Sequence, residues 1–234
     1  MKKKFAIILV NPKHQENIGL VARSMKNTGF EHLRIVGLKA FGEKTITTAV
    51  HARDILDNAR FYPDLSKACA DFNLIFAATA KPRKNFSTIS LQEAVKIMFD
   101  YPPSIKIGLL FGTERTGLTS EEMCNSNFRF MIPQAVKQPS YNLASAVLLT
   151  LFQIYSYSTH PESREKREAP LSWVEQDQCI RLILKKLAAK KFIHSANKKH
   201  MTQMVYELFG RLSMTPRDRN LLLAIFSKGP GDIF

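Results

Sequence analysis

Residues 105–118 read IKIGLLFGTERTGL, and this stretch decides the fold prediction. Apart from Lys106, its first seven residues form a strongly apolar run of strand length, which is typical of a strand buried on both faces of a sheet. Gly112 follows at once, and with Gly117 it flanks the acid–base pair Glu114-Arg115. Glycines at a strand end let a ligand approach the backbone, although an ordinary glycine turn has the same pattern. The stretch therefore predicts a buried strand that ends in a candidate binding loop.

Apolar runs elsewhere in the chain alternate with helical patterns. Strands are predicted at 5–10, 32–36, 74–78 and 128–132, and helices at 18–28, 47–58, 65–72, 91–99, 120–122 and 142–157. This alternation predicts an α/β layered domain with a mostly parallel sheet. Sites in such sheets lie at the carboxyl ends of the strands, so the loops of interest are 11–17, 79–85, 112–119 and 133–140.

The chain after residue 160 has a different organisation. Residues 161–170 are charged and bounded by prolines, which predicts a linker between a main domain (1–160) and a helical extension (171–234). Helices are expected at 171–191, 200–212 and 217–226. A three-helix module of this size is marginal by itself, so we expect it to lean on the main domain, a partner chain or RNA.

The charge balance indicates the class of partner. The 34 basic and 20 acidic residues give a net charge of +14. Such an excess favours a polyanion, first nucleic acid and second an acidic membrane surface. Residues 161–234 carry 14 basic and 8 acidic residues, net +6, so the extension has the higher charge density and is a candidate RNA-docking element.

Several classes of protein lose support. No apolar run reaches the roughly 18 residues of a membrane span, and no signal peptide is recognisable, so we expect a cytoplasmic protein. The three cysteines fit neither a disulfide framework nor a metal site, and no metal is expected. Motifs of dinucleotide-binding proteins, P-loop ATPases, HExxH metalloproteases and GxSxG hydrolases are missing.

Two further segments place polar residues at expected strand ends. In the first, Asn17 is a candidate helix cap, Gly19 permits close backbone approach, and Arg23 falls in the second helical turn. In the second, Ser140 and Asn142 begin a helix, where free N–H groups point outward. Taken singly, Arg23 also fits an ordinary surface arginine on a helix. Ser140 and Asn142 likewise fit simple capping of the helix that they begin.

Together the three segments resemble the motifs of the SpoU (TrmH-like) branch of the SPOUT RNA 2′-O-methyltransferases, over residues 5–157. The opening 10–19 and the helical tail look most like the TrmJ-type tRNA (cytidine/uridine-32-2′-O)-methyltransferases. The resemblance implies a C-terminal trefoil knot in the α/β domain, a homodimer and S-adenosylmethionine as cofactor. The predicted helix 142–157 supports the dimer independently, because it is apolar nearly all round and needs cover on more than one face.

The resemblance also implies roles for individual residues. The implied catalytic set is Arg23, Asn17, Glu114, Ser140 and Asn142, with Glu114 orienting cofactor or substrate. The implied cofactor-binding set is Ala78, Thr79, Ala80, Gly112, Gly117, Ile132, Pro139, Ser140, Tyr141 and Leu143, with Leu110, Ile132 and Leu143 as apolar walls. A guanidinium is unsuited to act as a base, so Arg23 should hold the target phosphate and stabilise charge on the 2′-oxygen. Phosphate, water or His14 would then remove the proton.

RNA contacts are expected from cations near the same sheet edge: Arg83, Lys84 and Arg115. Tyr141 and Phe86 are candidates to stack on RNA bases, but both side chains fit a packing role inside the protein equally well. The leading interpretation is a tRNA 2′-O-methyltransferase. The alternatives are the same chemistry on ribosomal RNA and a basic RNA-binding protein without catalysis.

Overall fold

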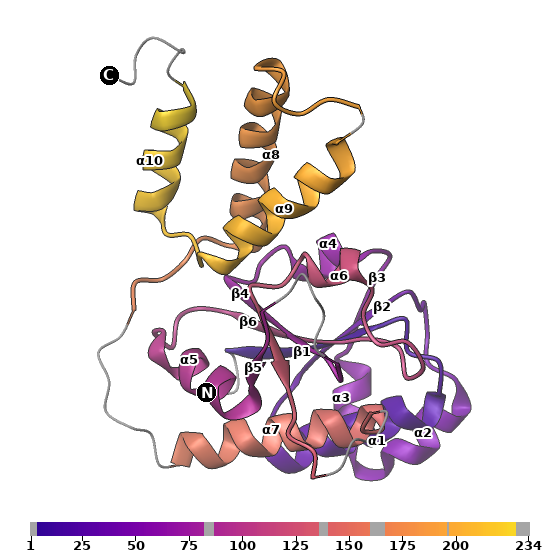
Figure 1. Cartoon of the computed structure of the whole chain (residues 1–234). Helices are drawn as coiled ribbons and strands as arrows, with labels where there is room; N and C mark the ends of the chain where they lie inside the picture. Colours follow the sequence, from indigo (N-terminus) through magenta and orange to yellow (C-terminus); the bar gives the residue numbers. More distant parts are fainter. Residues whose placement is uncertain (1–3, 82–86, 136–139, 160–166, 196, 228–234) are drawn as a thin grey trace.

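The chain folds around a seven-stranded sheet with helices on both faces (Figure 1). The computed structural model describes residues 4–81, 87–135, 140–159, 167–195 and 197–227. The strands are β1 (Phe5–Val10), β2 (His32–Val36), β3 (Arg60–Tyr62), β4 (Leu74–Ala78), β5 (Ile89–Ser90), β6 (Ile107–Phe111) and β7 (Phe128–Met131). They lie in the order β3-β2-β1-β6-β4-β7-β5, and every pairing is parallel. The predicted α/β class is confirmed, whereas the trefoil knot stays a prediction.

Alternation along the central strand builds two separate cores. Phe5, Ile7 and Leu9 of β1 face a large core that is covered by α1 (Gln15–Thr28), α5 (Leu91–Asp100) and α7 (Leu143–Thr159). The intervening residues of β1 face a smaller core under α4 (Leu65–Cys69) and α6 (Ser120–Met123). All six side chains of β1 are buried, as expected for a parallel strand with helices on both sides.

The first helix begins earlier than its hydrophobic pattern predicts. It starts at Gln15 rather than Ile18, so Arg23 falls in its third turn instead of its second. It ends as predicted at Gly29, whose φ of 77° and backbone N–H close the last turn. Gly19 lies against the next helix, since a Cβ there would approach the Thr45 carbonyl oxygen to 2.6 Å.

The helix predicted at 47–58 is broken into three pieces. They are α2 (Glu43–Ala49), the 3₁₀ turn η1 (Val50–Ala52) and α3 (Arg53–Asp57). Val50 has a φ of 51°, which interrupts the continuous helix. The short strands β3 and β5 were not predicted, because edge strands of three and two residues carry too little hydrophobic pattern.

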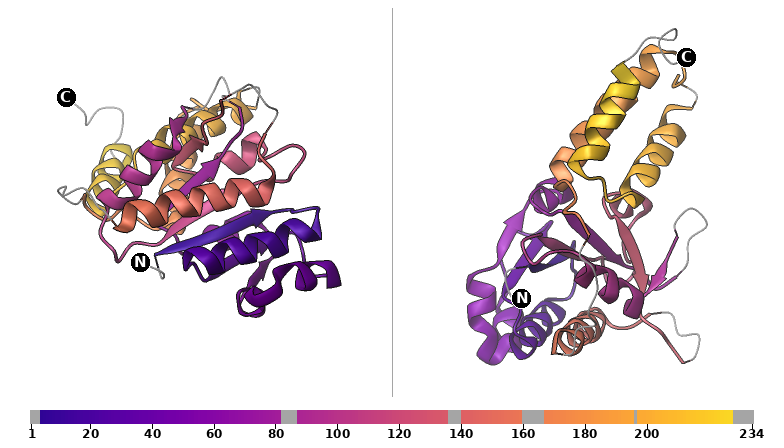
Figure 2. Two further views of the ribbon diagram at one scale, coloured as in Figure 1. Left: turned by 90° about the horizontal axis from the view of Figure 1, so that it is seen from below. Right: turned by 90° about the vertical axis from the view of Figure 1, so that its left-hand side faces the viewer.

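The tail consists of α8 (Trp173–Ala189), α9 (Lys198–Arg211) and α10 (Pro216–Ser227), which share a small core of their own. It packs on the sheet edge where β4 and β7 begin, as two views agree (Figures 1 and 2). Asn73 Nδ2 donates to the Pro170 carbonyl oxygen at 2.9 Å, and Asn127 Nδ2 donates to the Gly210 carbonyl oxygen at 3.1 Å. The tail therefore leans on the main domain, which is one of the three supports expected for it. The division of the chain into a main domain, a linker and an RNA-docking extension stays a prediction.

No helix in the described ranges is long and apolar enough to cross a bilayer. The same residues contain no group of three or more His, Cys, Asp or Glu side chains that could hold a metal ion.

Candidate functional site

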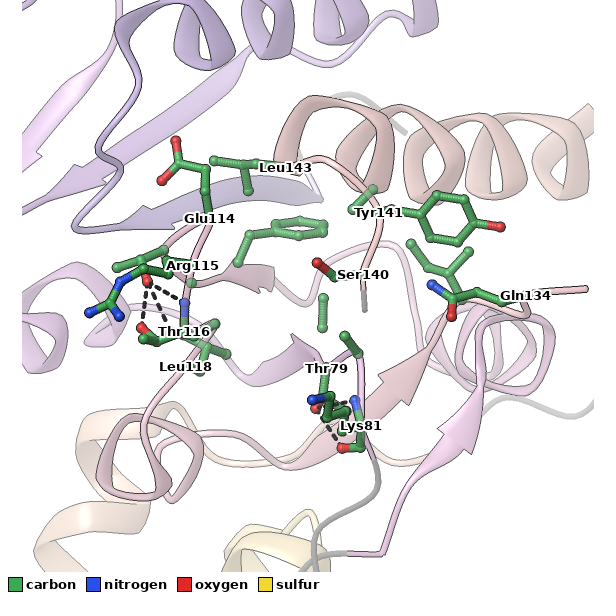
Figure 3. A pocket seen from close by; sticks show the side chains of 18 residues that line it. Thr79, Lys81, Glu114, Arg115, Thr116, Leu118, Gln134, Ser140, Tyr141 and Leu143 are labelled. Carbon is green, nitrogen blue, oxygen red and sulfur yellow. Dashed lines mark hydrogen bonds between the residues drawn. The ribbon is translucent and has the colours of Figure 1, made fainter. Parts of the chain in front are cut away.

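A cavity of ≈ 470 Å³ opens at the carboxyl ends of β4, β6 and β7 (Figure 3). Its position follows from the parallel sheet, because loops leaving neighbouring strands meet at this edge. The lining residues are Ala78, Thr79, Ala80, Lys81, Phe111, Gly112, Thr113, Glu114, Arg115, Thr116, Gly117, Leu118, Ile132, Gln134, Ser140, Tyr141, Leu143 and Ala146. Nine of the ten predicted cofactor-binding residues are among them; the tenth, Pro139, lies outside the described residues.

The pocket combines apolar walls with polar backbone. Ile132 and Leu143 line it as predicted, but Leu110 does not. Leu110 belongs to the smaller core on the other face of the sheet, and the next residue, Phe111, reaches the pocket instead. Gly117 lines the pocket with a φ of 66°, and a Cβ built there meets nothing within 4 Å. The cavity has the size of typical small-molecule sites, so it suits a nucleoside-sized cofactor.

Gly112 is required by the loop itself. A Cβ at this position would lie 2.3 Å from both the Gly117 carbonyl carbon and the Leu118 nitrogen. The loop closes on itself here, with Gly117 N–H donating to the Thr113 carbonyl oxygen at 2.9 Å. The sequence suggested that Gly112 lets a ligand approach the backbone. The structure shows that Gly112 instead leaves room for the backbone of Gly117 and Leu118, which returns beside it.

A chain of hydrogen bonds joins all three motifs. The Glu114 carboxylate accepts from the backbone N–H of Lys13 at 2.9 Å and of His14 at 3.0 Å, and from Asn17 Nδ2 at 3.0 Å. Asn142 Nδ2 in turn donates to Asn17 Oδ1 at 2.9 Å. We call Glu114, Asn17 and Asn142 the motif relay. It fixes the start of α1 relative to the pocket loop and to the start of α7.

The relay changes the interpretation of two of its members. Asn17 lies inside α1 and does not cap it; His14 holds the cap position, without a side-chain bond to the helix. Asn142 does cap α7, because its Oδ1 accepts from the Ala144 N–H at 2.9 Å. Glu114 lines the pocket, and its carboxylate accepts hydrogen bonds from the 13–17 segment. Figure 3 shows this carboxylate pointing away from Thr79 and Ser140, so it positions the start of α1, while its role in orienting cofactor or substrate stays a prediction.

Arg23 stands apart from the pocket. Its side chain is exposed on α1, is not among the lining residues, and forms no hydrogen bond or ion pair with any described residue. On the helix it neighbours Leu20, which is also exposed. The guanidinium is therefore available to a group that comes from outside this chain.

Comparison with known proteins identifies the family. The model of the SpoU rRNA methylase family matches residues 4–152. The chain belongs to this family. It is 38% identical to tRNA (cytidine-2′-O-)-methyltransferase TrmJ of Methanocaldococcus jannaschii over 154 residues. The matched region covers 64% of this chain and 67% of that protein.

Two other similar proteins match along nearly the whole chain. The tRNA (cytidine/uridine-2′-O-)-methyltransferase TrmJ of Photorhabdus laumondii is 27% identical over 97% of both proteins. The crystal structure of TrmJ from Z. mobilis has the same fold, with a TM-score of 0.82, 24% identity and coverage of 95% of this chain and 97% of that one. A more distant structure, the SpoU methyltransferase AviRb of Streptomyces viridochromogenes in complex with AdoMet, has a TM-score of 0.55, 17% identity and coverage of 68% and 62%.

The predicted RNA contacts of this SpoU-family chain are only partly described. Arg115 lines the pocket and is exposed. Arg83, Lys84 and Phe86 lie outside the described residues. Tyr141 is half-exposed at the pocket, and its hydroxyl donates to the Pro133 carbonyl oxygen at 2.9 Å, which holds the ring in place. Lys81, another pocket cation, was not singled out from the sequence.

The relay lowers the pKa of Glu114. Burial by itself would raise the pKa of this carboxyl, but the hydrogen bonds from Asn17 and from the Lys13 and His14 amides outweigh burial, so the pKa lies below its ordinary value of 4.5. A carboxyl whose pKa is lower in the folded than in the unfolded protein contributes its full stabilisation above the pKa of the unfolded state. This contribution is lost as the pH falls through the pKa of the folded state. The relay should therefore be intact at neutral pH and weaken only in acid.

We expect Glu114→Gln to lower methyl transfer roughly 100-fold, because an amide cannot accept all three hydrogen bonds and the start of α1 shifts relative to the pocket. The matched control is Glu121→Gln, at an exposed residue outside the pocket lining. In urea unfolding, Glu114→Gln should be less stable than the parent at pH 7, and the difference should shrink below pH 4.5. Equal turnover of parent and variant would show that the relay does not position the site.

Proposed function

We propose that the chain is an S-adenosylmethionine-dependent tRNA ribose 2′-O-methyltransferase acting at nucleotide 32 of the anticodon loop, on cytidine or uridine. The motif relay carries this proposal, because it ties a nucleoside-sized pocket to the helix that presents Arg23. Membership of the SpoU family supports the chemistry, and the printed activities of the two TrmJ relatives support tRNA as substrate. The position of the nucleotide rests on the motif resemblance.

The pocket residues fit the cofactor. When bound, S-adenosylmethionine supplies an electrophilic methyl group. Ile132 and Leu143 would hold its apolar parts and exclude water. Backbone groups of 78–80 and 112–117 would read its polar edges, with the open side of Gly117 allowing close approach. Ser140 lines the pocket and would bind cofactor or ribose through its hydroxyl.

Arg23 would act on the RNA. Its exposed guanidinium would hold the phosphate beside the target ribose and stabilise negative charge that develops on the 2′-oxygen. It would not remove the proton, because a guanidinium stays protonated at physiological pH. The proton would pass to phosphate, to water or to His14, whose backbone is held beside the site by Glu114.

A homodimer is part of the proposal. Leu148, Leu149, Phe152 and Tyr155 of α7 are exposed, although the opposite side of the helix is buried in the large core. Leu20 on the neighbouring α1 is exposed as well, and α1 and α7 lie side by side in Figure 1. A second copy that covers this apolar face would come next to Arg23, which follows Leu20 by one turn.

Two measurements separate the candidate functions. Titration with S-adenosylmethionine should show saturable binding; no binding at millimolar cofactor would favour an RNA-binding protein without catalysis. Transfer of a labelled methyl group should then be compared on tRNA and on ribosomal RNA. Labelled tRNA is expected, and exclusive labelling of ribosomal RNA would favour the alternative that the family's description suggests.

Removing the tail should separate cofactor binding from RNA binding. A chain cut after His160 keeps every residue that lines the pocket. We expect it to remain a dimer in sedimentation equilibrium and to bind cofactor, while RNA affinity falls and the salt slope decreases by roughly 0.7–0.9 per lost phosphate contact. Trp173 packs on the smaller core, so aggregation of the cut chain would instead assign the tail a structural role.

A further inference from the structure

The outer end of the tail carries a concentrated positive charge. Six lysines surround the connection between α8 and α9, and we call them the basic tip: Lys185, Lys186, Lys190, Lys191, Lys198 and Lys199. All six are exposed. No aspartate or glutamate occurs anywhere between Gln178 and Tyr206, so the sequence supplies no local countercharge.

Among the described residues, the lysines of the tip have no ion-pair partner, unlike many cations of the main domain. None of the six forms an ion pair within the described part of the chain, whereas Arg53, Lys67 and Lys106 each meet a carboxylate at 3.1–3.5 Å. Like charges held within a Debye length repel one another, and this repulsion works against the folded tail. A polyanionic partner would relieve it.

The tip is remote from the pocket. The tail packs where strands β4 and β7 begin, and the pocket lies where they end. Helix α8 has 17 residues and spans roughly 25 Å, and it carries the tip away from the main domain, as both views show (Figures 1 and 2). The tip and the pocket of one chain would therefore contact different parts of any partner that they share.

We propose that the basic tip binds the phosphate backbone of the RNA substrate at a place distant from the methylated nucleotide. This inference rests on the proposed function, since it takes RNA as the partner. Phe192, 59% exposed within the tip, offers a ring on which a base can stack. An anionic membrane is less suitable, because the lysines come from the end of α8, the connection and the start of α9 rather than from the polar face of one amphipathic helix.

The test uses the full chain with three tip lysines neutralised, Lys185→Gln, Lys190→Gln and Lys199→Gln. The control neutralises three cations that already have carboxylate partners, Arg53→Gln, Lys67→Gln and Lys106→Gln. Both triple variants lower the net charge equally. Affinity for bulk tRNA is measured from 50 to 200 mM salt, together with S-adenosylmethionine binding and binding to phosphatidylserine vesicles.

The tip variant should lose roughly tenfold or more in RNA affinity, and its slope of log affinity against log salt should fall by about 2–3. The control should change both far less, and cofactor binding should persist in each. RNA affinity equal to that of the parent, or an equal loss in the control, would overturn the proposal, as would loss of vesicle binding alone. If no RNA is methylated but the tip variant still loses RNA affinity, the proposed function fails and the tip's role stands.

Discussion

Replacing Arg23 with alanine should abolish methyl transfer while cofactor affinity stays within about twofold of the parent. The side chain is exposed and outside the pocket lining, so its removal leaves the cofactor site unchanged. Loss of a preorganised group that stabilises developing negative charge costs roughly 10²–10³ in turnover, and loss of phosphate binding adds to this. Single-turnover methylation with saturating enzyme measures the chemical step separately from binding.

Two comparisons sharpen this expectation. Arg23→Lys keeps the charge but not the planar fork of donors, so it should recover only part of the activity. Arg53→Ala removes another exposed arginine, one paired with Asp57, and should retain parental turnover. Turnover of Arg23→Ala equal to that of Arg53→Ala would remove Arg23 from the reaction.

Gly112→Val should abolish cofactor binding. Its Cβ would meet the backbone of Gly117 and Leu118 at 2.3 Å, and backbone cannot rotate away as a side chain can. The loop 112–117 would have to open, and with it one wall of the pocket. We expect calorimetry to show an affinity for S-adenosylmethionine at least about 100-fold weaker than that of the parent. This ratio corresponds to a loss of roughly 2.7 kcal/mol in binding free energy.

The control for this variant is Gly210→Ala in the tail. A Cβ there meets only the Ser126 carbonyl oxygen at 3.5 Å, an ordinary contact, so folding and cofactor binding should persist. Circular dichroism distinguishes a local loss of the pocket from unfolding of the main domain. A folded Gly112→Val variant with parental cofactor affinity would contradict the assignment of this pocket.

The pocket could be predicted from sequence because a parallel sheet brings the carboxyl ends of its strands to one edge. Strand β6 and the glycine that follows it were sufficient to place the binding loop. The identity of the wall residue was not predictable, since Leu110 and Phe111 are equally apolar and only the register decides which face each one takes.

The motif relay was beyond sequence reasoning for a different reason. Glu114 meets Asn17 across 97 positions, and two of its donors are backbone amides, which every residue has. No residue type signals such a contact. The helix start at Gln15 was missed because polar residues occupy its first turn, and the break at Val50 depends on one backbone angle.

The charge of the tail was visible in the sequence, but its distribution was not. Counting residues gives net +6 for 161–234. Only the arrangement of the tail helices shows that six lysines gather at the end farthest from the main domain, while the contacts that dock the tail use uncharged groups such as Asn73, Asn127 and Gln176.

Mapping ribose methylation at single-nucleotide resolution tests the central claim most directly. Unmodified tRNA is incubated with the purified full chain and S-adenosylmethionine, and 2′-O-methylated positions are read from resistance of the adjacent phosphodiester to alkali. We expect one new protected site, at nucleotide 32 of the anticodon loop, and none with Arg23→Ala. Methylation on a base, or no methylated ribose in tRNA at saturating cofactor, would contradict the account.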